Sequence, residues 1–324
     1  MTCLPKRDTM QVTSFIKEDT MKIATTTSDF SYYLNDHAAQ IRALHAAGFR
    51  YIDLSMYSLS PASPLMQDNW QEEVKRLKAT ADELGMQFVQ AHAPGTNFLS
   101  PKVTDMDFLE KSIHRSFAVC GALGIPNNVM HFGWAKELSK EESFEKNRAF
   151  CRKFLPTCEK FGVNVLVENS CKINMGDMYY PNSAKDILEF LSYVDHPMVH
   201  VCWDTGHANC EGTQYDEIVT LGKELYAIHY NDNHGNGDEH LMPYLGTMNH
   251  DEVISALIAA DFKGYFTLEC TSTLVKKHGW PRKRRPFEAD ERLINPPRFL
   301  QERMASAMYE VSKYMLNAYG IFEE

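Results

Sequence analysis

The sequence lacks any run of about 18 apolar residues, so it offers no candidate for a transmembrane helix. Its first twenty residues contain no apolar stretch of the kind found in secretory signal peptides. No two of its eight cysteines have CxxC spacing, and we interpret them as reduced, mostly packing thiols. Together these absences predict a cytoplasmic protein that does not bind membranes.

The sequence also lacks an excess of positive charge. It has 43 Asp and Glu residues against 33 Lys and Arg residues, and a formal net charge of −10. Surfaces that bind nucleic acid are normally basic, so this balance argues against a nucleic-acid partner. The most basic segment is KKHGWPRKRRP at 276–286. We interpret it as a solvated loop at an oligomer contact, with a phosphate, DNA or an acidic partner as the alternatives.

Short β-rich runs alternate with longer amphipathic stretches along most of the 324 residues. The predicted strands are 22–27, 51–56, 86–92, 127–133, 163–169, 198–204, 225–231 and 264–270. The predicted helices are 36–47, 70–84, 107–122, 143–161, 183–193, 216–222, 250–260 and 298–319. Glycine is typical of helix ends, and here glycines mark five helix-to-strand joints, at Gly48, Gly85, Gly124, Gly162 and Gly264.

Eight strands that are each followed by a helix predict a (β/α)8 TIM barrel. A doubly wound sheet is the alternative, but that fold usually has a glycine-rich loop after its first strand. Here the corresponding segment is TTTSDFSYY at 25–33. We therefore predict a polar N-terminal extension, 1–20, and a single barrel domain, 21–324, with a long loop at 271–297 and a C-terminal helix.

Metal-competent side chains recur at the ends of six consecutive predicted strands. They are His92, His131, Glu168, Asp204, His229 and Glu269. Barrel enzymes keep their sites at the carboxyl ends of the strands, so we expect these side chains to converge there. Carboxylates and imidazoles form a hard, mixed O/N ligand set that suits Mn²⁺, Mg²⁺, Co²⁺ or Zn²⁺.

Such a set suits the movement of a proton next to a carbonyl. A cation polarises the carbonyl, one carboxylate removes the proton, and a second carboxylate returns it elsewhere. As structural alternatives, Glu168 and Glu269 could be buried acids with cationic partners, and Asp204 could cap a helix that carries a surface His207. Tyr57, Trp134 and Trp203 are interpreted as core residues, although each lies near the expected site.

Seven motifs, in this order and spacing, resemble the sugar phosphate isomerase/epimerase family, the xylose isomerase-like TIM barrels related to endonuclease IV. They are HAPG (92–95), HFG (131–133), VEN (167–169), DTGH (204–207), HYND (229–232), DEHLMPYLG (238–246) and TLE (267–269). The resemblance implies that a divalent metal, Mn²⁺ foremost, binds Glu168, Asp204, His229 and Glu269. It also implies that Glu168 and Glu269 form the acid/base pair. The substrate contacts that it implies are His92, His131, His207, Asp238 and His240.

From this resemblance we expect an isomerase or epimerase that acts on a keto sugar or sugar derivative through a metal-stabilised enediolate. One alternative is the metal-dependent subunit of a C-glycoside lyase, which cleaves 3-oxo-glycosides by β-elimination together with a small second subunit. Another is an AP endonuclease similar to endonuclease IV, which holds three zinc ions with a DxxH and an Asp-x-His motif. A non-enzymatic sugar-binding barrel is a further alternative.

The chain departs from the ketose 3-epimerases in one loop. That branch has an arginine-containing motif after the seventh strand, where this chain has NDNHGNGDEH. The usual PGEG is also replaced, by PYLG at 243–246. The expected partners are a small carbohydrate or glycoside substrate and further copies of the chain in a homo-oligomer. Under the lyase alternative, a small second subunit takes the place of those copies.

Overall fold

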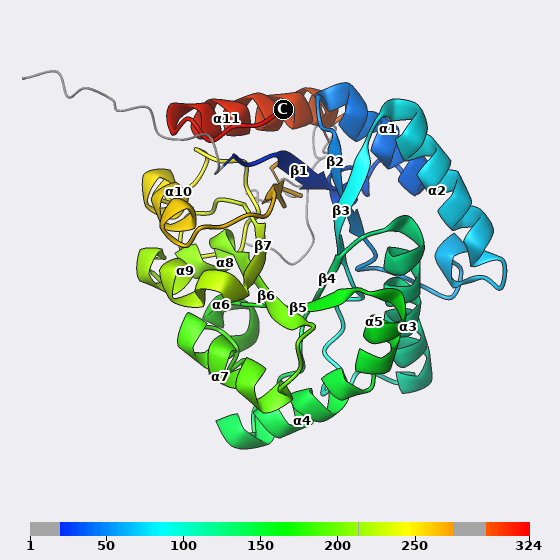
Figure 1. Cartoon of the computed structure of the whole chain (residues 1–324), viewed down its shortest axis with the longest axis vertical. Helices are drawn as coiled ribbons and strands as arrows, with labels where there is room; N and C mark the ends of the chain where they lie inside the picture. The colour runs from blue at the N-terminus through cyan, green and yellow to red at the C-terminus, as the bar shows by residue number, and fades with distance from the viewer. Residues whose placement is uncertain (1–19, 213, 272, 275–295) are drawn as a thin grey trace, which may run out of the picture.

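Eight parallel strands surround the centre of the molecule, and helices pack around the outside (Figure 1). The computed structural model describes residues 20–212, 214–271, 273–274 and 296–324. The strands are β1 Ile23–Thr26, β2 Tyr51–Ser55, β3 Gln87–His92, β4 Asn127–Met130, β5 Asn164–Glu168, β6 Val199–Asp204, β7 Leu225–His229 and β8 Phe266–Leu268. Their order in the sheet is β7-β6-β5-β4-β3-β2-β1-β8. A parallel bridge between Tyr230 and Leu268 links the two ends, so the sheet is a nearly closed barrel.

The outer helices occur in the predicted alternation with the strands. They are α1 His37–Ala47, α2 Trp70–Leu84, α3 Met106–Leu123, α4 Lys140–Arg152, α5 Leu155–Phe161, α7 Ala184–Val194, α9 Tyr215–Leu221, α10 His250–Ala259 and α11 Arg298–Ala318. There are also two short helices: α6 Lys172–Met175 lies in the loop after β5, and α8 Thr205–Asn209 follows β6 directly. The fold therefore confirms the predicted (β/α)8 barrel.

Three local predictions need correction. The helix predicted at 143–161 is two helices, α4 and α5, because Pro156 lies at the start of α5 and a proline cannot continue the preceding helix. The strand predicted at 127–133 ends at Met130, since the backbone of Gly133 bonds to the side chain of Asn147 at 2.7 and 2.9 Å. Gly264 does not end a helix, because the left-handed residue after α10 is Asp261, with φ of 54°.

The other four joint glycines do end helices. Gly48, Gly85, Gly124 and Gly162 all have positive φ at the C-caps of α1, α2, α3 and α5. At the N-termini of α1, α3, α4, α7 and α10, side chains accept backbone N–H groups, as Ser139 does in the capping box of α4. A cap of this kind contributes about 1 kcal/mol.

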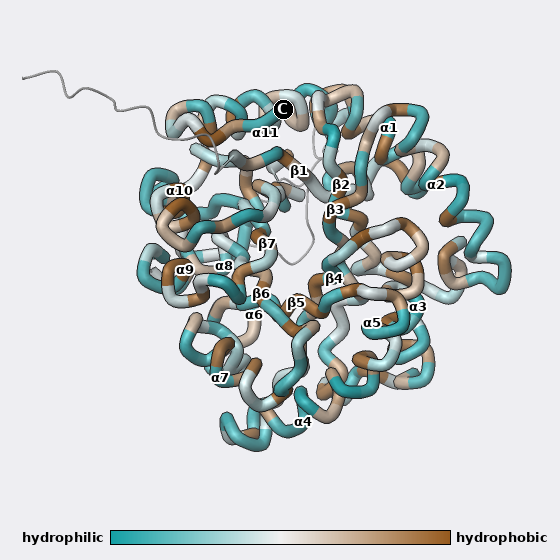
Figure 2. The backbone as a smooth tube through the Cα atoms, viewed as in Figure 1, coloured by the Kyte–Doolittle hydropathy of each residue, from teal (hydrophilic) through white to brown (hydrophobic). Residues whose placement is uncertain are grey.

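The core lies mainly between the barrel and its helices. Figure 2 shows hydrophilic residues along outer helices such as α2 and α4, and apolar residues on the strands. A small apolar cluster with one side chain from each of β4, β5, β6 and β7 is separate from this core, and consists of Val129, Leu166, Cys202 and Ala227. In the described part of the chain, no helix has the length and apolar composition that crossing a bilayer requires.

Parts of the predicted organisation lie outside the described residues. These parts are almost all of the extension 1–20, most of the loop 271–297, and the whole basic segment 276–286. Seven cysteines are described, and all seven are free thiols.

Candidate functional site

The carboxyl ends of the strands bring the predicted site residues together. His92, Glu168, Asp204 and His229 are the last residues of β3, β5, β6 and β7. His131 and Glu269 directly follow β4 and β8. Parallel strands in a barrel end at the same mouth, so residues up to 177 positions apart become neighbours in space.

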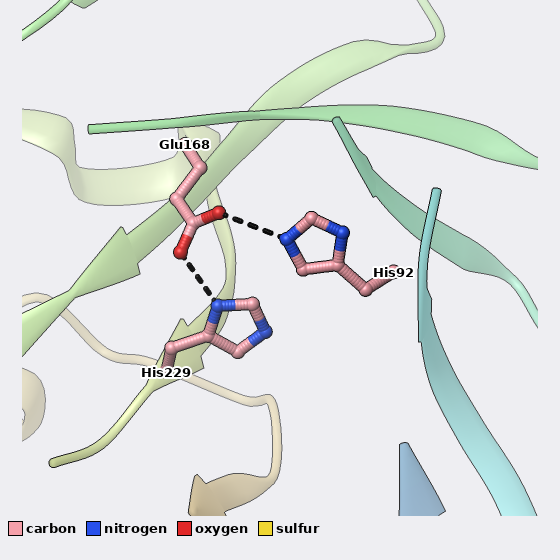
Figure 3. A group of neighbouring side chains, drawn as sticks. All are labelled: His92, Glu168 and His229. Atoms are coloured by element: carbon pink, nitrogen blue, oxygen red, sulfur yellow. Dashed lines mark hydrogen bonds and ion pairs between the residues drawn. The ribbon is translucent and has the colours of Figure 1, made fainter. Parts of the chain in front are cut away.

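Glu168 lies at the centre of this arrangement and is 1% exposed. Its Oε1 is 2.7 Å from Nδ1 of His229, and its Oε2 is 3.3 Å from Nε2 of His92 (Figure 3). His131 approaches the same Oε2 with its Nε2 at 3.2 Å. Burial alone would raise the pKa of the Glu168 carboxyl, but the facing histidines hold it well below its ordinary value. The site therefore keeps Glu168 ionised.

Three histidines are oriented by backbone carbonyls. Their Nδ1 atoms contact carbonyl oxygens: His92 contacts that of Ala93 at 2.7 Å, His207 that of Asn169 at 3.0 Å, and His240 that of Glu269 at 2.9 Å. A carbonyl can only accept, so Nδ1 carries the proton in each ring. In the neutral ring, Nε2 then has a lone pair, and in all three cases Nε2 faces a carboxylate of the site.

Asp204 fits both of the roles considered for it. Its Oδ1 accepts the backbone N–H of His207 at 2.6 Å and so caps α8, while Oδ2 accepts from Asn231 at 2.8 Å. It is also one of four residues whose ligand atoms lie within 4.8 Å of one another, together with Glu168, His229 and Glu269. The alternative of a surface His207 is wrong, because that side chain is buried.

A second cluster lies beside the first and comprises His207, Asp238 and His240. The two Nε2 atoms are 3.2 and 3.0 Å from the carboxylate oxygens of Asp238. Asn174 donates its Nδ2–H to Asp238 at 2.6 Å. It was not among the predicted site residues, because no motif marks it and it reaches the site from α6, a short helix in the loop after β5.

The chemistry of these side chains fits a cation. When the His92 ring is neutral, its Nε2 and the Oε2 of Glu168 are two hydrogen-bond acceptors that face each other without a proton between them. A cation between them would interact favourably with both atoms. Within the described residues, Oε2 of Glu168 and Oδ1 of Asp238 are buried without a well-aligned hydrogen bond. Glu168, Asp204, His229 and Glu269 could hold a divalent metal, and His207, Asp238 and His240 form a second set of ligand type.

A cavity of about 530 Å³ opens onto both clusters. Tyr57 and Trp134 line it. Tyr57 is 46% exposed, so its assignment to the core is wrong, whereas Trp134 is half-buried and packs against the core as predicted. The core assignment is confirmed for Trp203, which is buried and donates its Nε1–H to Gln214 at 3.3 Å.

Two further polar residues lie inside the barrel beneath the site and were also missed. Asp53 on β2 and Gln90 on β3 are 1% and 3% exposed and approach His229 from the side opposite Glu168. A signal for Gln90 exists in the sequence, because alternate residues of a strand share a face and Gln90 is two residues before His92.

The fold and the site define a (β/α)8 barrel with a histidine and carboxylate centre at the carboxyl mouth. A model of the family described as xylose isomerase-like TIM barrel matches residues 41–290. The chain belongs to this family, which confirms the resemblance noted in its motifs.

Individual relatives are distant. An uncharacterised protein of Methanocaldococcus jannaschii is 26% identical over 160 residues, which are 47% of this chain and 54% of that protein. The chain thus spans about half the length of the first curated relatives that it matches.

Two solved structures are similar over nearly the whole chain. D-psicose 3-epimerase from Clostridium cellulolyticum H10 has a TM-score of 0.70 and 20% identity, covering 91% of this chain and 99% of that one. The 3-keto-D-glucoside 4-epimerase from E. coli, in its apo form, has a TM-score of 0.66 and 14% identity, covering 90% and 99%. At these identities the likeness shows the fold.

Proposed function

We propose that the protein is a divalent-metal-dependent isomerase or epimerase that acts on a keto sugar or sugar derivative. The observation that carries the proposal is the convergence of Glu168, Asp204, His229 and Glu269 on one point of the barrel mouth. The names of the two similar structures, both sugar epimerases, support it.

These four residues would hold the metal, with Mn²⁺ as the expected ion and Mg²⁺, Co²⁺ or Zn²⁺ as alternatives. When bound, the metal supplies positive charge that polarises the substrate carbonyl and stabilises the enediolate that forms when a proton is lost.

Glu168 and Glu269 are the acid/base pair in this proposal. Histidines lower the pKa of both carboxyls against the opposing effect of burial, so that each is in its ionised, basic form near neutral pH. One carboxylate takes the proton from the carbon beside the carbonyl. The other first takes up a proton from solvent and then donates it to the opposite face of the same carbon in an epimerisation, or to the neighbouring carbon in an isomerisation.

The remaining polar groups of the cavity would hold the substrate in place. His92, His131, His207, Asp238 and His240 present nitrogen and oxygen atoms to the cavity. Burial lowers the pKa of His131 to about 4, so this ring is neutral and can hydrogen-bond to a sugar hydroxyl without adding charge. The aromatic rings of Tyr57 and Trp134 offer apolar surface to the carbon skeleton.

The test is exchange of substrate protons with solvent. Chelator-stripped protein, with and without added Mn²⁺, is incubated with a panel of ketoses in deuterated water, and deuterium incorporation is followed by NMR. We expect exchange only with metal, and a loss of about 10²- to 10⁴-fold in Glu168→Gln and Glu269→Gln. Glu83→Gln, on the surface in a salt bridge to Arg42, is the matched control and should keep full activity. Metal-independent exchange, or full activity in both site variants, refutes the proposal.

The second cluster favours one competing function, that of an AP endonuclease. His207, Asp238 and His240, together with His92 and His131, provide more ligands than a single metal needs. The same preparations are therefore incubated with a duplex oligonucleotide that carries one abasic site. Metal-dependent nicking at that site, without exchange on sugars, would assign the nuclease function instead.

The lyase alternative shares the proton-abstraction step and differs in its outcome. The similarity to a 3-keto-glucoside epimerase makes a 3-oxo-glycoside a necessary member of the substrate panel. Release of the free aglycone, together with a small second chain that co-purifies, would support the lyase. A homo-oligomer and a cytoplasmic location stay predictions.

A further inference from the structure

We propose that Asp53 and Gln90 are positioning residues for His229, which hold its ring so that Nδ1 is the atom that meets the metal. This inference rests on the metal centre of the proposed function, because it concerns the way in which one of the four ligands is presented. Neither residue belongs to the ligand set or to the lining of the cavity.

The ring of His229 has two different sides. On one side, Nδ1 is 2.7 Å from Oε1 of Glu168 and 3.5 Å from Oε2 of Glu269, which are two of the other ligand residues. On the other side, Nε2 is 2.8 Å from the Nε2 of Gln90 and 3.4 Å from Oδ2 of Asp53. We call the Nδ1 edge of the ring the ligand side and the Nε2 edge the supporting side. Different neighbours contact each of them.

The ring of His229 is turned the opposite way from the rings of the other oriented histidines of the site, so that its two nitrogen atoms exchange roles. His92, His207 and His240 bond to backbone carbonyls through Nδ1 and face the carboxylates with Nε2. In His229 it is Nδ1 that faces the carboxylates, so the partner for Nε2 has to come from inside the barrel. The two side chains on β2 and β3 provide it from across the barrel.

The neighbours leave the ring little freedom. His229 is fully buried and stacks on His92, with ring centroids 5.6 Å apart and planes 9° from parallel. Gln90 also lies 3.4 Å from Oδ2 of Asp53, so the three side chains form one contiguous group. All three are nearly inaccessible to solvent, and water therefore does not replace a partner that is removed.

The chemistry requires an acceptor on the supporting side. Nδ1 can bind a metal only through its lone pair, so the neutral ring carries its proton on Nε2. The carboxylate of Asp53 accepts that proton, and its second oxygen, Oδ1, has no hydrogen bond within the described residues. Turning the amide of Gln90 round would let its oxygen accept the same N–H, in place of the Nε2–H that donates to Oδ2 of Asp53 at 3.4 Å. Removing such outer partners of a ligand histidine typically weakens metal binding by about 10- to 100-fold.

The test measures binding of Co²⁺ to the full-length, chelator-stripped protein. Calorimetry gives the Kd, and visible absorption reports the geometry of the bound ion. We expect Asp53→Asn to raise the Kd by about 10- to 100-fold and to change the absorption spectrum. Gln90→Met removes the polar amide but keeps a side chain of similar length, and it should raise the Kd by a smaller factor.

Asp29→Asn is the matched control. Asp29 is equally buried and lies on the segment after β1. Its carboxyl group accepts a hydrogen bond from Thr25, and its backbone carbonyl accepts one from Gln301. Burial raises its pKa to about 8, so the substitution removes no charge at pH 7. We expect its Kd and spectrum to match those of the wild type.

The outcomes separate this inference from the proposed function. If the wild type does not bind Co²⁺, the metal centre itself is refuted. If the wild type binds and Asp53→Asn binds with the same Kd and spectrum, the positioning role is overturned. Circular dichroism of the metal-free variants shows whether each is folded, and if Asp53→Asn is not, an unchanged Kd in Gln90→Met overturns the inference.

Discussion

Tyr57 packs directly on Gly95, so closely that a Cβ atom at position 95 would be only 1.8 Å from the tyrosine ring. The same ring is edge-on to His92, with centroids 5.2 Å apart, and forms part of the cavity wall. A methyl group at position 95 must therefore push the ring into the cavity or out of it. We predict that Gly95→Ala raises KM for the sugar substrate by about 10-fold or more, as expected when packing beside a site is displaced by about 1 Å.

Gly85→Ala is the control for this prediction. Gly85 ends α2 with φ of 64°, and a Cβ atom added there would have no other atom within 4 Å, so alanine causes backbone strain and no clash. We expect a loss of about 1–2 kcal/mol in unfolding free energy and an unchanged KM. Equal KM values for the wild type and Gly95→Ala would show that Tyr57 does not contact the substrate.

Asn174 provides a test of the second cluster. Its Nδ2 donates to Oδ2 of Asp238 at 2.6 Å, and a hydrogen bond to a charged group contributes about 1.5–3 kcal/mol. We predict that Asn174→Ala raises KM by about 10- to 100-fold, because Asp238 loses the partner that orients it. Steady-state kinetics would show this directly.

Asn164→Ala is the matched control for that variant. Asn164 begins β5 at the opposite end of the barrel and donates to Asn127 at 3.0 Å. It should leave KM unchanged. If both asparagine variants alter KM equally, the effect comes from the stability of the barrel rather than from the orientation of Asp238.

Metal should also stabilise the fold. Glu168, Asp204 and His229 end β5, β6 and β7, and Glu269 directly follows β8, so a metal that binds all four links the ends of four strands. At a free metal concentration about 100-fold above Kd, the native state gains about 2.7 kcal/mol. We predict that chelation lowers the Tm measured by calorimetry, and that added Mn²⁺ restores it. The same Tm with and without metal would contradict a four-ligand site.

The barrel and the first ligand set could be predicted from the sequence because both depend on strand ends. A strand in a parallel barrel has a recognisable apolar run, and the residue that ends it must lie at the mouth. Glu168, Asp204 and His229 can be located in this way without knowledge of any contact. The end of β4 was misplaced, because a side-chain contact from Asn147 ends that strand and short-range patterns do not contain it.

The supporting residues were harder to predict for a different reason. Asn174 belongs to a loop helix whose position depends on tertiary packing, and Tyr57 was assigned to the core because aromatic residues are usually buried. Asp53 gave a weak signal, as one acidic residue within the apolar run YIDLS, and its partner on β7 is 176 residues away in the sequence.

Asp29 leads to a prediction about pH and stability. Its side chain is fully buried, and burial raises its pKa from an ordinary value of 3.8 to about 8. Between these two values the folded protein keeps a proton that the unfolded chain has lost, so the free energy of unfolding must fall as pH rises.

One such proton contributes about 1.4 kcal/mol per pH unit at the steepest part of the curve. We predict that the Tm of metal-free wild-type protein falls more steeply from about pH 5 to about pH 8 than that of Asp29→Asn, which has no proton to lose at this position. Titrating groups that do not interact with Asp29 are common to both proteins and cancel in the difference, so parallel Tm curves would contradict a protonated Asp29.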